Sequence, residues 1–275
     1  MSGVAGVIAA AREQGRAVLV GYLPVGFPDV DTSVAAMLAM VEAGVDIVEV
    51  GVPYSDPLMD GPVIQAAVDA ALRGGTRTRD AISAAGAVAH DGAPALVMTY
   101  WNLVERYGVD AFARDLAAAG GAGLITPDLI PDEAGQWVSA SDEHDLERVF
   151  LVAPSSTDAR LVSTARACRG FVYAASTMGV TGTRTSVGDA ARVLVERTRA
   201  VTDLPVCVGL GVSDGAQAAE VAAFADGVIV GSALVRCLAD AASPERGVAA
   251  VARLAAELAD GVRSGRAVTG PGVPV

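Results

Sequence analysis

The sequence contains no lysine. All 20 basic side chains in the 275 residues are arginine. A Schiff base requires a lysine amine, so this absence excludes any mechanism that passes through one. It also excludes a covalently attached pyridoxal cofactor on this chain.

Histidine and cysteine are scarce. The two histidines, His90 and His144, lie far apart, and Cys168, Cys207 and Cys237 form no C-x-x-C spacing. We therefore expect no metal site, because zinc ligands usually come in closely spaced pairs. The odd cysteine count, with Cys207 inside an apolar run, indicates reduced thiols in a cytoplasmic protein.

Positive charge and long apolar runs are also lacking. The formal net charge is −12, which argues against a nucleic-acid or anionic-membrane partner. Charged residues interrupt positions 1–20, and no apolar run approaches the roughly 18 residues that a membrane span needs. We expect a soluble, cytoplasmic protein, and the 52% of hydrophobic residues suffices for a large core.

Eight short runs rich in Val, Ile and Leu indicate strands that are covered on both faces, as in a parallel sheet. They lie at 17–23, 46–52, 95–100, 123–126, 149–153, 171–175, 205–210 and 227–230. Segments with helical periodicity separate them, at 32–43, 109–119, 132–143, 158–168, 187–200 and 213–224. Asp, Ser or Thr residues open several of these segments and are typical helix caps.

This alternation predicts a single (β/α)8 barrel over residues 1–260, with an extra N-terminal helix. An open doubly wound sheet fits less well, because no G-x-G-x-x-G follows the first strand. Residues 261–275 are predicted to be a flexible C-terminal tail. Two connections, 53–61 and 176–186, are longer than a plain βα loop and follow strands two and six, where a barrel places its active site.

Glu49 is a carboxylate inside the apolar run of the second strand. Burying it costs several kcal/mol unless it is paired or used in chemistry. A structural ion pair with an arginine is the alternative, but no arginine lies within the eight predicted strands.

Asp60 follows in the loop 53–61, directly before Gly61 and Pro62. By itself this pattern is as typical of a turn or a helix cap as of a catalytic group. At the carboxyl end of strand two, however, Asp60 can reach the same cavity as Glu49. Two carboxylates in different environments can divide the roles of acid and base.

Glycines cluster after the last two strands, in VGLGVS at 208–213 and VGSAL at 230–234. Backbone amides and helix N-termini at this position can hold a phosphate without lysine, although tight turns alone would also explain the glycines. The Gly- and Thr-rich loop 176–186 is consistent with a lid over a ligand, or simply with a solvated loop.

Together these motifs resemble the tryptophan synthase alpha subunit family, from residue 19 to about 258. The most specific matches are EVGVPYSDPLMDGPVIQ at 49–65, MTYWN at 98–102, ITPDL at 125–129, Tyr173, GVTG at 179–182 and GLG at 209–211. The resemblance implies a barrel lyase that cleaves indole-3-glycerol phosphate to indole and glyceraldehyde 3-phosphate. It implies no cofactor on this chain, and a pyridoxal-phosphate beta subunit as partner in an α2β2 assembly.

The resemblance also implies roles for individual residues. Glu49 is expected to move protons at indole C3 and the side-chain hydroxyl, and Asp60 to accept a hydrogen bond from the indole N–H. Tyr173 and Thr181 match positions near this pair, and Thr181 is expected to meet Asp60 when the lid closes. The phosphate cradle matches Gly182, Gly209, Gly211, Gly231 and Ser232, and the apolar indole pocket matches Tyr22, Met98, Ile125, Leu210 and Ile229.

Three residues depart from the family pattern and affect pocket detail rather than the reaction. Tyr54 and Met59 stand where Phe and Ala are common, and Leu210 replaces an aromatic residue found in some members. Two other functions stay open: a free-standing indole-3-glycerol phosphate lyase that supplies indole to another pathway, and a non-catalytic allosteric partner. Intact Glu49 and Asp60 argue against the second.

Overall fold

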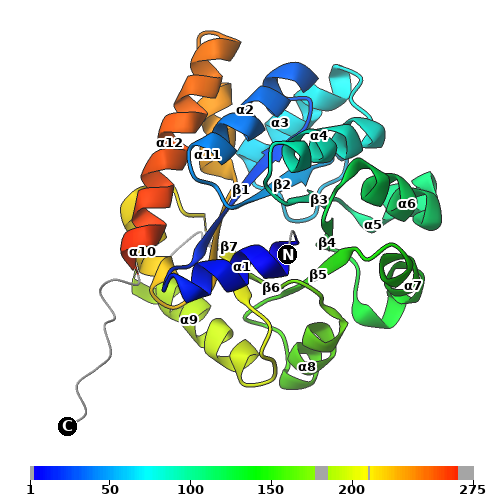
Figure 1. Ribbon diagram of the computed structural model, residues 1–275, viewed down its shortest axis with the longest axis vertical. Coiled ribbons are helices and arrows are strands. Elements are labelled where there is room, and N and C mark those ends of the chain that lie inside the picture. Colours follow the sequence, from blue (N-terminus) through cyan, green and yellow to red (C-terminus); the bar gives the residue numbers. More distant parts are fainter. Residues whose placement is uncertain (1–2, 177–184, 210, 266–275) are drawn as a thin grey trace.

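The computed structural model describes residues 3–176, 185–209 and 211–265 (Figure 1). Eight parallel strands pair in chain order and close into a barrel. The strands are β1 (Val18–Pro24), β2 (Ile47–Gly51), β3 (Ala95–Met98), β4 (Gly123–Thr126), β5 (Glu147–Val152), β6 (Val172–Ala175), β7 (Val206–Gly209) and β8 (Gly227–Val230). The predicted (β/α)8 barrel is therefore confirmed.

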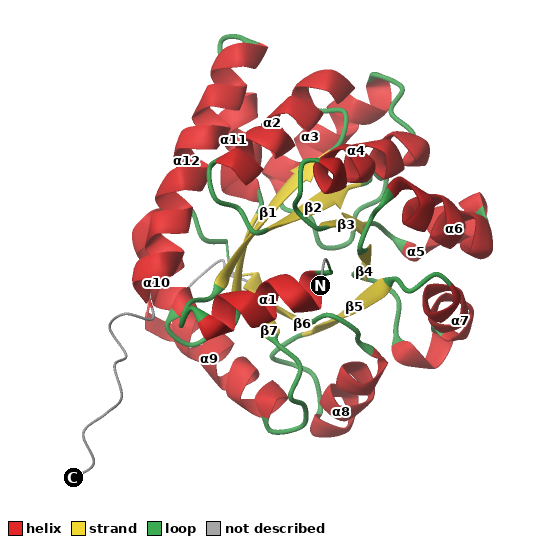
Figure 2. Ribbon diagram, in the orientation of Figure 1, coloured by secondary structure: helices red, strands yellow, loops and turns green. Residues whose placement is uncertain are grey.

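The helices surround the strands (Figure 2). They are α1 (Val4–Glu13), α2 (Val30–Glu42), α3 (Pro62–Arg73), α4 (Thr78–His90), α5 (Trp101–Tyr107), α6 (Val109–Ala119), α7 (Gly135–Glu143), α8 (Asp158–Ala167), α9 (Thr185–Arg199), α10 (Gly215–Ala222), α11 (Ser232–Ala239) and α12 (Pro244–Gly265), with a 3-10 turn η1 (Pro131–Glu133) before α7. Asp29, Thr157 and Asp214 cap α2, α8 and α10 through their side chains.

Strand side chains alternate between the barrel interior and the helix layer, and both environments are apolar. Val18 and Val20 of β1 point inward, while Leu19 and Leu23 pack against the helices. This double burial explains why the strands have continuous rather than alternating hydrophobicity. The predicted extra helix α1 lies across one end of the barrel and packs on the interior through Ile8 (Figure 1).

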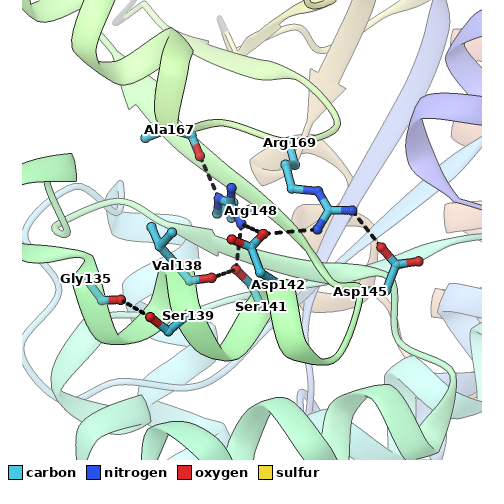
Figure 3. Close-up of polar contacts among 9 residues, drawn as sticks. All are labelled: Gly135, Val138, Ser139, Ser141, Asp142, Asp145, Arg148, Ala167 and Arg169. Atoms are coloured by element: carbon cyan, nitrogen blue, oxygen red, sulfur yellow. Dashed lines mark hydrogen bonds and ion pairs between the residues drawn. The ribbon is translucent and has the colours of Figure 1, made fainter.

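Strand β5 begins earlier than predicted and contains an arginine. Arg148 is buried, but it points outward (Figure 3). It donates to Ala167 O at 2.8 Å, to Ser141 Oγ at 2.9 Å and to Asp142 Oδ1 at 2.5 Å. The expectation that the strands contain no arginine is therefore wrong. Arg148 nevertheless ties α7 and α8 to the barrel, and its partners in the described residues do not include Glu49.

The C-terminal helix extends past the predicted domain boundary. α12 continues through residue 260 to Gly265, with Val262 buried, so residues 261–265 are helical and not tail. Residues 266–275 lie outside the described part of the chain. Within the described ranges, no helix is both long and apolar enough to cross a membrane.

Candidate active site

A cavity of about 220 Å³ opens at the carboxyl ends of the strands. Glu49 and Asp60 both line it, as the sequence predicted. The other described lining residues are Tyr22, Met59, Ile64, Met98, Leu151, Tyr173, Ala175, Ser176, Gly209, Gly211, Ile229, Gly231 and Ser232. The walls are mainly apolar with a few convergent polar groups, which is typical of a small-molecule site.

Glu49 lies at the centre of β2, paired with Tyr22 on one side and Leu96 on the other. Its side chain points into the barrel and is 1% exposed. Within the described residues, Oε1 has no hydrogen-bond partner. Burial disfavours the charged form and raises the pKa of Glu49 from 4.5 to about 8. Glu49 can therefore hold a proton at neutral pH, and no arginine of the described segments forms an ion pair with it.

Asp60 approaches the cavity from the loop before α3. Its side chain is half-buried, and this burial raises the pKa of the carboxyl group. The helix-cap interpretation is wrong, because the N-cap of α3 is Gly61 and no side chain caps this helix. Gln65 Nε2 donates a hydrogen bond to the backbone oxygen of Asp60 at 2.7 Å. Gln65 therefore holds the backbone of Asp60 and not its carboxylate.

Two tyrosine rings fill space that glycines leave open. A Cβ on Gly51 would lie 2.4 Å from Tyr22 Oη, and a Cβ on Gly209 would lie 2.6 Å from Tyr173 Oη. Burial raises the pKa of both phenols, and the nearby carboxylates raise it further. The tyrosines therefore stay neutral beside the two acids and shape the cavity as flat, mainly apolar walls.

The opposite end of the cavity is formed by backbone. Gly209 is the last residue of β7, and Gly211 follows it. Gly231 follows β8, and α11 begins at Ser232. Gly211 has φ +70°, a conformation that favours glycine. Amides at a helix N-terminus attract anions, so this end is suited to a phosphate group.

Tyr100 holds the loop that carries Asp60. Its hydroxyl accepts hydrogen bonds from the backbone amides of Leu58 at 3.0 Å and Met59 at 3.2 Å. Its ring packs on Tyr54 with 4.7 Å between centroids, and Asn102 Nδ2 donates to Tyr54 Oη at 3.0 Å. The segment after β3 thus fixes the loop after β2.

Comparison with known proteins decides the family. A family model of the tryptophan synthase alpha chain matches residues 8–263. The tryptophan synthase alpha chain of Salinispora arenicola is 65% identical over 254 residues, which cover 92% of this chain and 95% of that protein. The chain belongs to the tryptophan synthase alpha chain family.

Solved structures agree with this family. A crystal structure of tryptophan synthase from M. tuberculosis, an open form with BRD0059 bound, has a TM-score of 0.87 at 60% identity and covers 94% of this chain and 98% of its own. Tryptophan synthase subunit alpha from Legionella pneumophila has a TM-score of 0.86 at 28% identity, and the match covers 95% of this chain and 98% of that chain. The predicted family and the predicted lyase reaction, cleavage of indole-3-glycerol phosphate to indole and glyceraldehyde 3-phosphate, are confirmed.

Not every residue assigned by resemblance to the tryptophan synthase alpha family lies on the cavity. Ile125 is fully buried in the barrel interior and is not among the described lining residues. Thr181, Gly182 and Leu210 lie outside the described residues, as does most of the proposed lid.

Sequence reasoning also missed part of the wall, namely Ile64, Leu151 and Ala175; it named Met59 only as a departure from the family pattern and Ser176 only as the start of the lid loop. One signal was present for Leu151. It lies two residues after the inward-facing Val149 in the same strand, so it also faces inward, nearer the carboxyl end.

Proposed function

We propose that Glu49 and Asp60 carry the cleavage of indole-3-glycerol phosphate in this chain, acting as the alpha component of an α2β2 tryptophan synthase. The observation that supports this most directly is the buried Glu49, whose pKa is raised to about 8 and which faces the same cavity as Asp60. A protonated acid near neutral pH suits proton transfer to carbon followed by proton removal from oxygen.

In this proposal, protonated Glu49 gives its proton to indole C3, and the ring nitrogen becomes positive. Asp60 accepts a hydrogen bond from the indole N–H and stabilises that charge. The Glu49 carboxylate then takes the proton of the side-chain hydroxyl while the carbon–carbon bond breaks. The bonding electrons return to the indole ring, which gives neutral indole and an aldehyde and restores the protonated acid.

The remaining residues position the substrate. Tyr22, Met98, Tyr173 and Ile229 form the apolar slot for the flat indole ring, with Leu210 as a further proposed member. The backbone of Gly209, Gly211, Gly231 and Ser232, with Gly182, holds the phosphate. Thr181 is proposed to meet Asp60 when the loop 176–186 closes over the ligand. The two carboxylates would then lie beside the bond that breaks.

An apolar surface on the rim supports a protein partner. Leu58 is 79% exposed and Met59 is 52% exposed, on the loop that carries Asp60. Leu58 and Met59 are adjacent, and contiguous exposed apolar surface marks interaction sites. We place the beta subunit against this rim, which extends over the loop around Asp56 and the segment after Tyr100. Relatives include a tryptophan synthase from M. tuberculosis solved in an aminoacrylate-bound form.

The alpha chain carries no cofactor of its own, and pyridoxal phosphate belongs to the beta subunit. The absence of lysine from the chain is consistent with this division. We place the assembly in the cytoplasm, which suits a biosynthetic enzyme with three free cysteines.

Glu49→Gln tests the catalytic assignment. The side chain keeps its shape but has no proton to give, so indole release from indole-3-glycerol phosphate should stop while the substrate still binds. Isothermal titration with the variant measures binding separately from turnover. Turnover like that of the unmodified chain would return Glu49 to a structural role.

Indole release with and without a tryptophan synthase beta subunit and serine tests the assembly. We expect slow release by the isolated chain and a many-fold increase in the complex. Leu58→Asp should weaken this stimulation and leave the isolated chain unchanged, because the backbone amide that bonds Tyr100 remains. Fast release that the beta subunit does not alter would favour the free-standing lyase, and no release in either case would favour the non-catalytic partner.

A further inference from the structure

A second hollow of about 520 Å³ lies between α11 and α12. These two helices contact each other on one side of the barrel (Figure 1). Its lining includes Arg236 from α11 and Arg246 and Arg253 from α12. Asp240 is the single carboxylate among the described lining residues. We refer to this hollow, defined by the three arginines, as the arginine groove.

The charges of the arginine groove are largely uncompensated. All three guanidinium groups are exposed, and none forms an ion pair within the described residues. Ten of the other arginines in the described part of the chain do form one. In a chain of net charge −12, three clustered cations beside one carboxylate create a local region of positive potential.

The arginine groove adjoins the phosphate end of the active-site cavity. Ser213 and Ala233 line the groove, whereas Gly211 and Ser232 line the cavity. Ser213 lies two positions after Gly211, and Ala233 directly follows Ser232. Helix α11 therefore contributes residues to both the groove and the cavity. An anion held in the groove is therefore close to the backbone amides at the start of α11.

We propose that the arginine groove attracts the phosphate group of the substrate and delivers it to the phosphate end of the cavity. This rests on the proposed placement of the phosphate at Gly211, Gly231 and Ser232. A phosphate monoester carries close to two negative charges at neutral pH. The strongly acidic chain repels such a dianion at long range, and a positive groove next to the phosphate end reverses that repulsion locally.

The test replaces charge in the groove and leaves the reacting groups untouched. A triple variant, Arg236→Gln with Arg246→Gln and Arg253→Gln, should raise KM for indole-3-glycerol phosphate roughly tenfold at an ionic strength of about 0.01 M. The difference should shrink to less than about twofold near 0.5 M, where the Debye length is a few ångströms. Turnover at saturation should not change, because no catalytic group is altered.

Two further variants separate local charge from other effects. Lysine at the same three positions should restore the KM of the unmodified chain, since attraction requires charge rather than a planar guanidinium group. A matched control changes Arg77, Arg79 and Arg166 to glutamine. These are exposed and form no ion pair within the described residues; Arg77 and Arg79 lie at the start of α4 and Arg166 lies on α8. The control makes the same change in net charge and should leave KM within about twofold.

Competition with inorganic phosphate supplies a readout that does not depend on the indole ring. The triple glutamine variant should bind phosphate more weakly at low salt, and its affinity for uncharged indole should not change. An unaltered KM at low salt, or an equal rise in the control variant, would overturn the proposal. Failure of the catalytic assignment is detected separately, by turnover in Glu49→Gln, so the two ideas can fail independently.

Discussion

Replacing Glu49 by glutamine should make the protein more stable, and by an amount that grows with pH. The pKa of Glu49 is about 8 in the folded chain, compared with an ordinary value of 4.5. Between these two pH values the unfolded chain releases the proton and the folded chain keeps it. The unfolded state binds fewer protons in this window, so the stability of the unmodified protein falls as pH rises through it.

The magnitude follows from the size of the shift. Each pKa unit corresponds to about 1.4 kcal/mol, so the full shift amounts to about 5 kcal/mol above pH 8. This is an upper bound, because water and loop movement around an ionised Glu49 recover part of the cost. Glutamine does not titrate, so the stability of the variant does not fall with pH for this reason. At about 2–4 °C per kcal/mol for a domain of this size, its Tm should exceed that of the unmodified protein by roughly 10 °C at high pH.

Thermal unfolding followed by circular dichroism, at about pH 5 and about pH 8.5, measures this difference. The effect of pH on the other titratable groups is the same in both proteins, so it cancels when the two Tm values are subtracted. The exposed Glu13 on α1, changed to glutamine, controls for the loss of one negative charge. A Tm difference between variant and unmodified protein that is equal at the two pH values would refute the argument that Glu49 is buried without a partner.

Three other substitutions test the geometry of the site. Asp60→Asn should keep the fold and lower turnover by about 10²-fold or more, as measured by indole release, because the amide lacks the charge that we propose stabilises the ring nitrogen. Tyr100→Phe removes the acceptor for two backbone amides of the loop that carries Asp60, and steady-state kinetics should show kcat reduced by about three- to tenfold with little loss of Tm. Gly209→Ala places a Cβ 2.6 Å from Tyr173 Oη and should lower both Tm and substrate affinity, and adding Tyr173→Phe should partly restore them. A mutant of Gly209 with unchanged Tm and KM would contradict the close packing.

The sequence by itself determined the barrel and the two carboxylates that line its cavity. Eight apolar runs separated by helical segments specify alternating strands and helices, because each element must bury one face and short connections leave few arrangements. Glu49 could be identified because a carboxylate in an apolar run is costly wherever the strand lies. Asp60 could be placed beside it because the loop after a barrel strand opens on the carboxyl face.

The depth of a side chain in the barrel was decided by the tertiary structure. Ile125 and Leu151 both belong to apolar strand segments, but Leu151 lines the cavity and Ile125 lies in the interior. Neighbouring strands of a closed barrel are staggered, so position within an apolar run does not fix height along the barrel axis.

Contacts between distant segments likewise required the folded chain. The loop that carries Asp60 is held by Tyr100, 40 residues later, and the space for Tyr173 comes from Gly209 on the next strand. The arginine groove joins α11 to the third turn of α12. A local sequence pattern indicates what it costs to bury a residue. Which residue that side chain then contacts depends on strand register and helix packing, and these are set only in the closed barrel.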